Sequence, residues 1–291
     1  MSQQIEFKKL RDFGGIIGDT FLFIKQNFKP LLKVFLYLCG FFILAGIVAS
    51  AMHEISMQNT PAVQNGPFSS RNFSDILNWN YFLMIFVSIG SYTAITVSIL
   101  SFIALYIQKG KVAPSPEEVW AYFKYYYFRT FFSSLGVGLF ACIAFLFCIV
   151  PGIYVWPAMC LFYPIMILEN ASFDYSFGRA FKLLKDQWWN TAAVILVIYF
   201  ITYACMMIPA IPGMLFTMIG TFIPAVKEWN SALIIIGAIF QNLTYVFMII
   251  PAVGIALCYF NLVEVQESAG LMDRIHQFGE EKNENPPLEE Y

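Results

Sequence analysis

Long apolar runs alternate with short polar stretches along the chain, and the clearest example covers residues 131–168. Two apolar runs without a single charge lie there, separated by Pro151 and Gly152. At ~1.5 Å per residue, one helix of this length would exceed a ~30 Å hydrocarbon core. Pro151 lacks a backbone donor and Gly152 tolerates positive φ, so the chain can reverse at this dipeptide. The pattern predicts a transmembrane hairpin.

The segment after this hairpin, 169–189, is amphipathic. One helical face carries the apolar positions Phe173, Phe177, Ala180, Phe181, Leu184 and Trp188. The other face carries Asp174, Gly178, Lys182, Lys185 and Asp186. Because one face is apolar and the other charged, this helix is predicted to lie in the membrane interface.

Residues 1–29 predict a second amphipathic helix, followed by the first span at 31–51. Its apolar stripe consists of Leu10, Phe13, Ile17, Phe21, Ile24 and Phe28. Pro30 suits the first turn of the span. Ala49-Ser50-Ala51 resembles a signal-peptidase site, but the region before it is long and amphipathic. An uncleaved membrane anchor is therefore the favoured interpretation.

A polar loop, 52–79, separates the first span from the second, 81–107. His53 and Glu54 in this loop could form a metal or acid–base pair, although two adjacent residues do not make a site. The second span contains an unusual share of small and hydroxyl residues: Ser88, Gly90, Ser91, Tyr92, Thr93, Thr96, Ser98 and Ser101. They could line a cavity, but close packing between helices is the favoured interpretation.

A third interfacial helix is predicted at 115–129. Ser115 and Glu118 have the spacing of a capping box, and Pro116 occupies the first helical position. The helix leads directly into the hairpin, where Ser134, Gly138 and Cys142 place small residues every four positions for close packing.

The fifth span is predicted at 191–208, where Pro209 and Pro212-Gly213 end it. The following apolar stretch, 214–226, is too short to cross again, and we expect a re-entrant or interfacial half-helix. The sixth span, 231–260, is expected to kink at Pro251. Buried amides are costly unless they are bonded, so the polar residues near its middle should face another helix. These residues are Gln241, Asn242 and Thr244, and a substrate site there is the alternative.

Basic residues divide unequally between the two sides of this topology. Fifteen of the 17 lysines and arginines precede or open the first span, lie in 108–130 or 169–190, or belong to the tail. Only Arg71 and Lys227 fall on the opposite side. Because positive charge accumulates on the cytoplasmic side, both termini are predicted to be cytoplasmic.

The predicted fold is all-α: a polytopic membrane protein with six spans and three cytoplasmic-face amphipathic helices. An interfacial helix ending in aromatic and basic residues is followed by a pair of spans three times over. The expected domains are an N-terminal interfacial helix (1–29), a six-span membrane domain (30–262) and an acidic disordered tail (263–291).

Composition supports this class and excludes others. Hydrophobic residues make up 59% of the chain and charged residues only 12%, about half the charge usual in a soluble domain. No basic cluster suits nucleic acid. All six cysteines lie inside apolar runs, so free thiols are expected rather than disulfides. They are Cys39, Cys142, Cys148, Cys160, Cys205 and Cys258.

Pro151-Gly152-Ile153-Tyr154, Pro164, Glu169 and the run 176–189 resemble a known family. They are similar to the membrane domain fused to some bacterial glycerophosphodiester phosphodiesterases, and to related stand-alone polytopic proteins. Arg179, Leu183 and Trp188 match that pattern, whereas Ala180, Leu184 and Asp186 replace its usual Ser, Thr and Gly. The resemblance implies a stand-alone, multi-pass protein of the bacterial cytoplasmic (inner) membrane without the hydrolase domain.

Three functions compete on this sequence: a non-enzymatic protein that scaffolds partners or organises lipid, a transporter of a lipid-like substrate, and a membrane enzyme. Ion-coupled transport usually needs an ionisable residue inside a span, and none is found there. Chemistry on lipids needs converging acids, bases or metal ligands, but His53 and His276 lie far apart in the chain. We therefore expect no catalytic, metal or cofactor site. Membrane lipids and other membrane proteins are the expected partners.

Overall fold

The computed structural model describes residues 5–59, 77–147, 149–222 and 230–267, and every regular element within these ranges is a helix. The helices are α1 (Phe13–Gln26), α2 (Phe28–Asn59), α4 (Trp79–Gln108), α5 (Pro116–Phe147), α6 (Ile149–Leu168), α7 (Phe173–Leu184), α8 (Trp188–Phe222), α9 (Asn230–Leu243), the 3₁₀ helix η2 (Thr244–Met248) and α10 (Ile249–Glu267). Six helical stretches are long and apolar enough to cross a membrane. The predicted all-α, six-span fold is confirmed.

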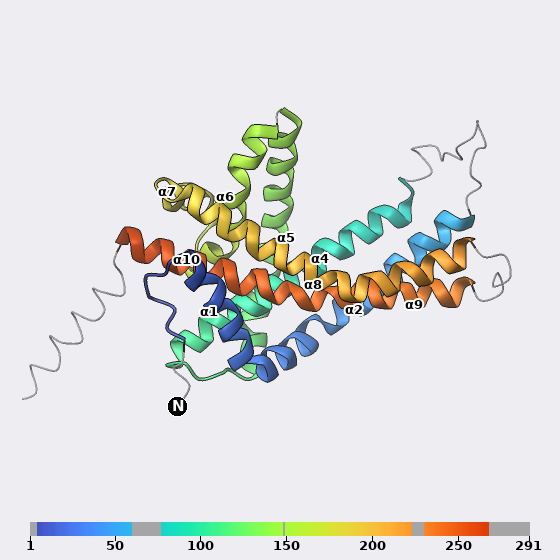
Figure 1. The fold of residues 1–291 in the computed structure, drawn as a ribbon, viewed down its shortest axis with the longest axis horizontal. Helices are drawn as coiled ribbons and strands as arrows, with labels where there is room; N and C mark the ends of the chain where they lie inside the picture. The colour runs from blue at the N-terminus through green and yellow to red at the C-terminus, as the bar shows by residue number, and fades with distance from the viewer. Residues whose placement is uncertain (1–4, 60–76, 148, 223–229, 268–291) are drawn as a thin grey trace, which may run out of the picture.

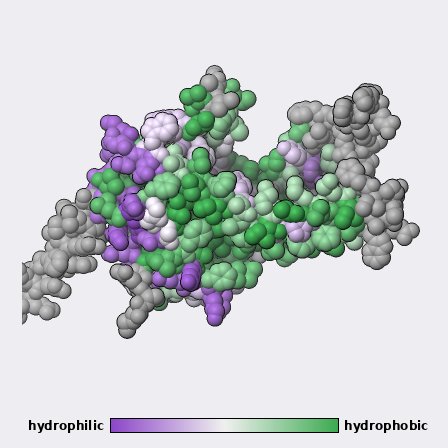
Figure 2. All heavy atoms as spheres, in the orientation of Figure 1, coloured by the Kyte–Doolittle hydropathy of each residue, from purple (hydrophilic) through white to green (hydrophobic). Residues whose placement is uncertain are grey.

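The long helices form two groups that diverge from a common polar end (Figure 1). Helices α2, α4, α8 and α9 extend together to one end, while the α5–α6 hairpin points away from them. The opposite end holds α1, α7 and the C-terminal part of α10. Hydrophilic residues gather at that end, and hydrophobic residues cover most of the remaining visible face (Figure 2). This distribution suits a protein whose polar end lies at one membrane surface.

Helices α4, α6 and α10 form the interior. More than half of the most apolar stretch of α4 and of α6 is buried, and most residues of α10 are buried, compared with less than a third of the corresponding stretches of α2, α5 and α8. The large side chains with almost no exposure include Phe102 on α4 and Phe162 on α6, together with Phe23 on α1. In a membrane, the exposed apolar faces of α2, α5 and α8 would contact lipid.

The predicted hairpin is present, but its turn is not at Pro151-Gly152. Helix α6 begins at Ile149, so both residues lie in its first turn, where Gly152 has an ordinary helical conformation. The glycine is needed for space, because a Cβ there would collide with the ring of Phe145 on α5. The expectation of positive φ at Gly152 is therefore wrong, although a close approach between helices does require the residue.

Two predicted breaks are replaced by continuous helices. The interfacial helix expected at 115–129 is the first half of α5, which runs on to Phe147. Its start is as predicted: Ser115 N–H donates to Glu118 Oε2 at 2.8 Å, and Pro116 is the first helical residue. Helix α8 continues through Pro209 and Pro212 to Phe222, so within the described residues no half-helix begins at 214.

The last predicted span is interrupted close to the expected position. The 3₁₀ helix η2 separates α9 from α10, and Pro251 is the third residue of α10. A proline cannot bond to the carbonyl four residues earlier, so the tighter 3₁₀ turn just before it has a direct cause. Helix α10 then continues to Glu267, into the segment expected to be a tail; residues 268–291 lie outside the described ranges.

The amphipathic helices α1 and α7 are present, but their predicted apolar faces are only partly correct. In α1 the buried residues are Ile16, Thr20 and Phe23, whereas Phe13 and Phe21 of the predicted stripe are exposed, and Leu10 and Phe28 lie outside the helix. In α7 the buried residues are Ser176, Ala180, Leu183 and Leu184, of which Ala180 and Leu184 were predicted.

Candidate functional site

An arginine at the polar end joins three helices. Arg179 of α7 donates from Nε to Glu169 Oε1 at 2.8 Å, and from its two terminal nitrogens to both oxygens of Glu267 at 2.7 and 3.0 Å. The hydroxyl of Tyr259 donates to the same oxygen of Glu169 at 2.8 Å. Glu169 follows α6 and Glu267 ends α10. This Arg179 cluster therefore holds the polar ends of α6, α7 and α10 together.

Further contacts complete the attachment of α7. Gln266 of α10 donates to the carbonyl of Leu183 at 2.7 Å. Arg129 of α5 donates to Asn170 Oδ1 at 3.1 Å and to the carbonyl of Ala171, in the loop before α7. The hydrogen bonds that Arg179 donates to the carboxylates of Glu267 and Glu169 raise its pKa above the usual value. Because these charges are paired with one another, the cluster is suited to holding helices rather than to proton transfer.

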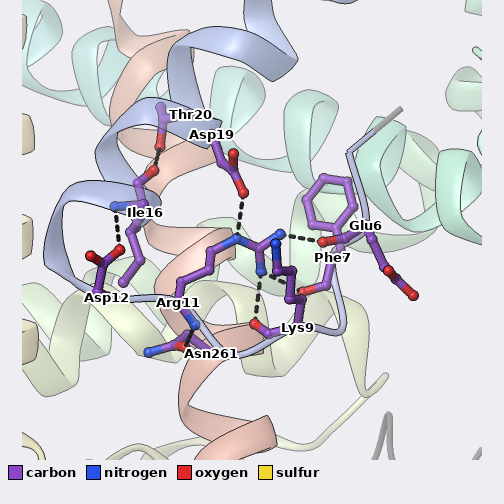
Figure 3. Close-up of polar contacts among 10 residues, drawn as sticks. Glu6, Phe7, Lys9, Arg11, Asp12, Ile16, Asp19, Thr20 and Asn261 are labelled. Carbon is purple, nitrogen blue, oxygen red and sulfur yellow. Dashed lines mark hydrogen bonds and ion pairs between the residues drawn. The ribbon is translucent and has the colours of Figure 1, made fainter. Parts of the chain in front are cut away.

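A second arginine organises the N-terminal segment, residues 5–12 (Figure 3). The side chain of Arg11 is 2% exposed and donates from Nε to Asp19 Oδ2 at 2.8 Å. Its terminal nitrogens donate to the carbonyls of Phe7 at 2.8 Å and Lys9 at 3.0 Å, and also to that of Glu6. The backbone N–H of Arg11 donates to Asn261 Oδ1 of α10 at 2.7 Å.

The N-terminal segment also packs through aromatic rings. The ring of Phe7 lies 5.1 Å from that of Phe23, 5.3 Å from that of Phe260 and 6.2 Å from that of Tyr106. Sequence reasoning placed Arg11 on the polar face of a helix, but the helix begins only after Asp12, whose side chain accepts the N–H of Gly15. That N-cap residue was the available signal, since an aspartate before an apolar run marks a helix start.

An apolar groove of about 530 Å³ opens between α6 and the start of α8, beside the tip of α5. We call it the tryptophan groove. Its lining residues are Phe145, Ile153, Trp156, Trp188, Trp189, Ala192, Ala193 and Leu196. Two of its eight lining residues are alanines of α8, and three are tryptophans. Every lining side chain is hydrophobic or aromatic, so the groove suits an apolar ligand.

Trp188 fixes one edge of the groove. Its ring stacks on that of Tyr154 at 5.6 Å, and its Nε1 donates to the carbonyl of Tyr154 at 3.0 Å. Trp189 meets Trp188 edge to face and is 82% exposed. Trp188 was expected to anchor the interfacial helix, whereas it is the first residue of α8 and joins this helix to α6.

Basic residues precede the groove along the chain. Lys182 lies in the last turn of α7, and Lys185 lies in the short turn that leads to Trp188. Both side chains are exposed. Tryptophan rings favour the boundary between headgroups and acyl chains, and lysines favour the headgroup layer. The start of α8 therefore combines both features beside an apolar opening.

The polar residues of the second span mainly make packing contacts. Ser91 Oγ donates to the carbonyl of Phe42 at 3.3 Å, and the hydroxyl of Thr93 lies 3.5 Å from that of Ser134. A cavity beside Tyr92 has a volume of about 20 Å³, enough for about one water molecule. These contacts agree with the favoured packing interpretation.

The polar residues predicted in the sixth span behave differently from one another. Asn242 Nδ2 donates to Ser50 Oγ of α2 at 3.0 Å and to the carbonyl of Ala238 at 2.9 Å. The prediction that it faces another helix is therefore correct. Thr244 donates to the carbonyl of Gln241 within its own segment, and Gln241 itself is exposed.

The remaining candidate groups do not come together. His53 lies in α2 rather than in a loop, with its ring 5.6 Å from that of Tyr81, and His276 is outside the described ranges. Among the residues that the structure describes, no group of three or more His, Cys, Asp or Glu could hold a metal ion. Five cysteines are free thiols, as predicted, and the sixth, Cys148, is not described.

Comparison with known proteins identifies no relative: no family model, curated protein or solved structure matches the chain. The function is therefore argued from the geometry of the sites alone.

Proposed function

We propose that this multi-pass protein is a non-enzymatic phospholipid-binding protein of the cytoplasmic membrane. One acyl chain lies in the tryptophan groove, and the phosphate lies near Lys185. The observation that carries the proposal is the groove itself: about 530 Å³ of apolar space beside an aromatic rim. This volume falls in the range of ligand sites, about 300–1,000 Å³. The proposal also allows a scaffolding role, in which the protein with its bound lipid contacts other membrane proteins.

The basic residues just before the groove in sequence suggest which phospholipid is preferred. Lys182 and Lys185 are exposed, and Asp186, the next residue along the chain, offsets only one of their charges. A lysine near the surface contributes about 1 kcal/mol to the attraction of an anionic lipid. Phosphatidylglycerol is therefore the natural probe for this groove.

Filling the groove should reduce lipid binding. In Ala193→Phe, the added ring occupies the space that the acyl chain needs, so we expect at least a fivefold loss of bound phosphatidylglycerol. The chain offers a matched control, because Ala204 is also exposed on α8 but does not line the groove. Native mass spectrometry of the two purified variants counts the lipids retained. Equal retention by Ala193→Phe and Ala204→Phe would contradict the proposal.

The orientation in the membrane can be tested separately. The 15-to-2 division of basic residues supports cytoplasmic termini. We expect reporters fused at residue 65 and at the C-terminus to give opposite results: alkaline phosphatase active only at 65, and green fluorescent protein fluorescent only at the C-terminus. If the same reporter were active at both positions, the chain would cross the membrane an even number of times between them, and the six-span topology would be wrong.

A transporter remains the alternative suggested by the sequence. The cavity of about 20 Å³ between Tyr92 and Pro251 is far smaller than a lipid-like substrate. No specific observation favours transport over binding, so the binding function is the one we propose.

A further inference from the structure

A second pocket lies at the polar end, away from the tryptophan groove. Its volume is about 270 Å³, and it is bounded by Lys8 of the N-terminal segment, the end of α4, and Tyr259 and Glu264 of α10. We call it the polar pocket. Ile107 and Phe260 contribute an apolar wall. Its volume is slightly below the usual range for drug-sized ligands, so it suits a group the size of a lipid headgroup.

The walls of the polar pocket are fixed before any ligand arrives. Arg11 ties the N-terminal segment to Asp19 and to Asn261, which is next to the pocket residue Phe260 in α10 (Figure 3). Phe7, next to Lys8, is 3% exposed and packs on Phe260. A site with preformed walls loses little conformational entropy on binding. Lys8 is therefore held close to the pocket by its neighbours on both sides.

The other polar groups are also held in place. Tyr259 donates its hydroxyl proton to Glu169, which leaves the phenol oxygen to accept from a ligand. The Oε1 atom of Gln108 accepts a hydrogen bond from the hydroxyl of Tyr122 at 2.9 Å. The amide nitrogen of Gln108 is then the group that can donate to a ligand. The pocket thus combines a donor amide, an acceptor hydroxyl, one cationic side chain and one anionic side chain.

We propose that the polar pocket binds a phosphoethanolamine group, with its phosphate toward Lys8 and Gln108 and its ammonium toward Glu264 and Tyr259. A purely anionic ligand would face the carboxylate of Glu264, and a purely cationic one would face the ammonium of Lys8. Both side chains already take part in interactions within the protein, and the ligand adds to these. A zwitterion places an opposite charge beside each of these side chains, and a primary ammonium can donate three hydrogen bonds.

Two sources could supply this group: the headgroup of phosphatidylethanolamine, and soluble phosphoethanolamine. The apolar wall formed by Ile107 and Phe260 would contact the glycerol and upper chain of a lipid, whereas the soluble compound would leave this wall uncovered. The experiment below contains an arm for each source. The inference does not depend on the tryptophan groove, which lies elsewhere in the fold.

The test compares phosphatidylethanolamine with phosphatidylglycerol of identical acyl chains, both titrated against the full chain by native mass spectrometry. The protein should carry Ala193→Phe, so that the groove does not contribute to the count. We expect about tenfold tighter binding of phosphatidylethanolamine, the effect of one charge-assisted hydrogen bond. Glu264→Gln should remove this preference, and Lys8→Gln should weaken both lipids. Competition by free phosphoethanolamine would identify a soluble ligand, and its failure to compete would identify the lipid.

Two matched controls separate the pocket from general surface charge. Lys9→Gln removes the neighbouring exposed lysine, and Glu117→Gln removes an exposed carboxylate at the start of α5; neither residue lines the pocket. Both variants should keep the tenfold preference. Equal affinity for the two lipids in the parent protein, or a preference that survives Glu264→Gln, would overturn the inference. Thermal melting of each variant checks that it remains folded.

Discussion

Arg179→Met is expected to lower the free energy of unfolding by about 3 kcal/mol, because one arginine neutralises two carboxylates in the Arg179 cluster. Without the guanidinium, Glu169 and Glu267 would face each other at the polar ends of α6 and α10. Repulsion between the two carboxylates and the loss of their hydrogen bonds then both lower the free energy of unfolding. The side chains of Arg179 and Glu169 are 13% and 19% exposed, so water can replace the guanidinium only in part.

This effect can be measured by titrating the purified protein from mild detergent into sodium dodecyl sulfate. Lys185→Met, which changes an exposed lysine immediately after the same helix, is the matched control and should change the midpoint little. Arg179→Lys should recover only part of the stability, because an ammonium cannot bridge both carboxylates in the way a planar guanidinium does. Equal midpoints for Arg179→Met and the parent protein would show that the cluster does not hold the three helices together.

Gly237→Leu is expected to have a comparable cost, about 3 kcal/mol, through the packing of α9 on α8. A Cβ at residue 237 would lie 3.0 Å from the carbonyl oxygen of Gly213 and would overlap Thr217 Oγ1. A backbone oxygen cannot move aside as a flexible side chain can. The two helices would therefore have to separate along the surface where small residues let them meet.

A second glycine provides the control for this experiment. Gly40 lies in α2, and a Cβ there meets nothing within 4 Å. Gly40→Leu adds the same side chain to another membrane helix and should leave the detergent midpoint within experimental error. A similar loss of stability in both leucine variants would mean that helix composition, rather than the contact between α8 and α9, determines the result.

The six spans could be predicted from sequence because a membrane requires long apolar segments and little else. The prolines misled the prediction inside those segments. Pro209 and Pro212 suggested a break, since in water a lost backbone hydrogen bond is easily replaced by solvent. In a hydrocarbon core no solvent is available, so the helix continues and neighbouring groups accommodate the proline. Helix α8 therefore passes both residues without interruption.

The orientation of α1 shows a second limit of hydrophobic patterns. The predicted stripe included Phe13 and Phe21, yet these are 37% and 39% exposed, while Thr20 is fully buried. A pattern identifies which face is apolar, but in a membrane protein that face can meet either lipid or other helices. Thr20 is satisfied by donating to the carbonyl of Ile16, which allows a hydroxyl to occupy the interior.

The two pockets proposed as binding sites could not be found in the sequence, because each is assembled from distant segments. Trp188 and Trp189 could be recognised in the sequence as the aromatic end of an interfacial helix. However, the groove also needs Phe145 and Ile153, which come from the α5–α6 hairpin. Lys8 and Glu264 are separated by almost the whole chain. Only the packing of the N-terminal segment on α10 brings them to one pocket.

The hydrogen bond between Arg11 and Asn261 has a consequence for biosynthesis. Residues 5–12 are translated long before α10, yet their binding surface includes this helix. During synthesis the segment must therefore wait, with Phe7 uncovered, until α10 has been inserted. A nascent protein that stops before α10 keeps this segment accessible to proteases and chaperones.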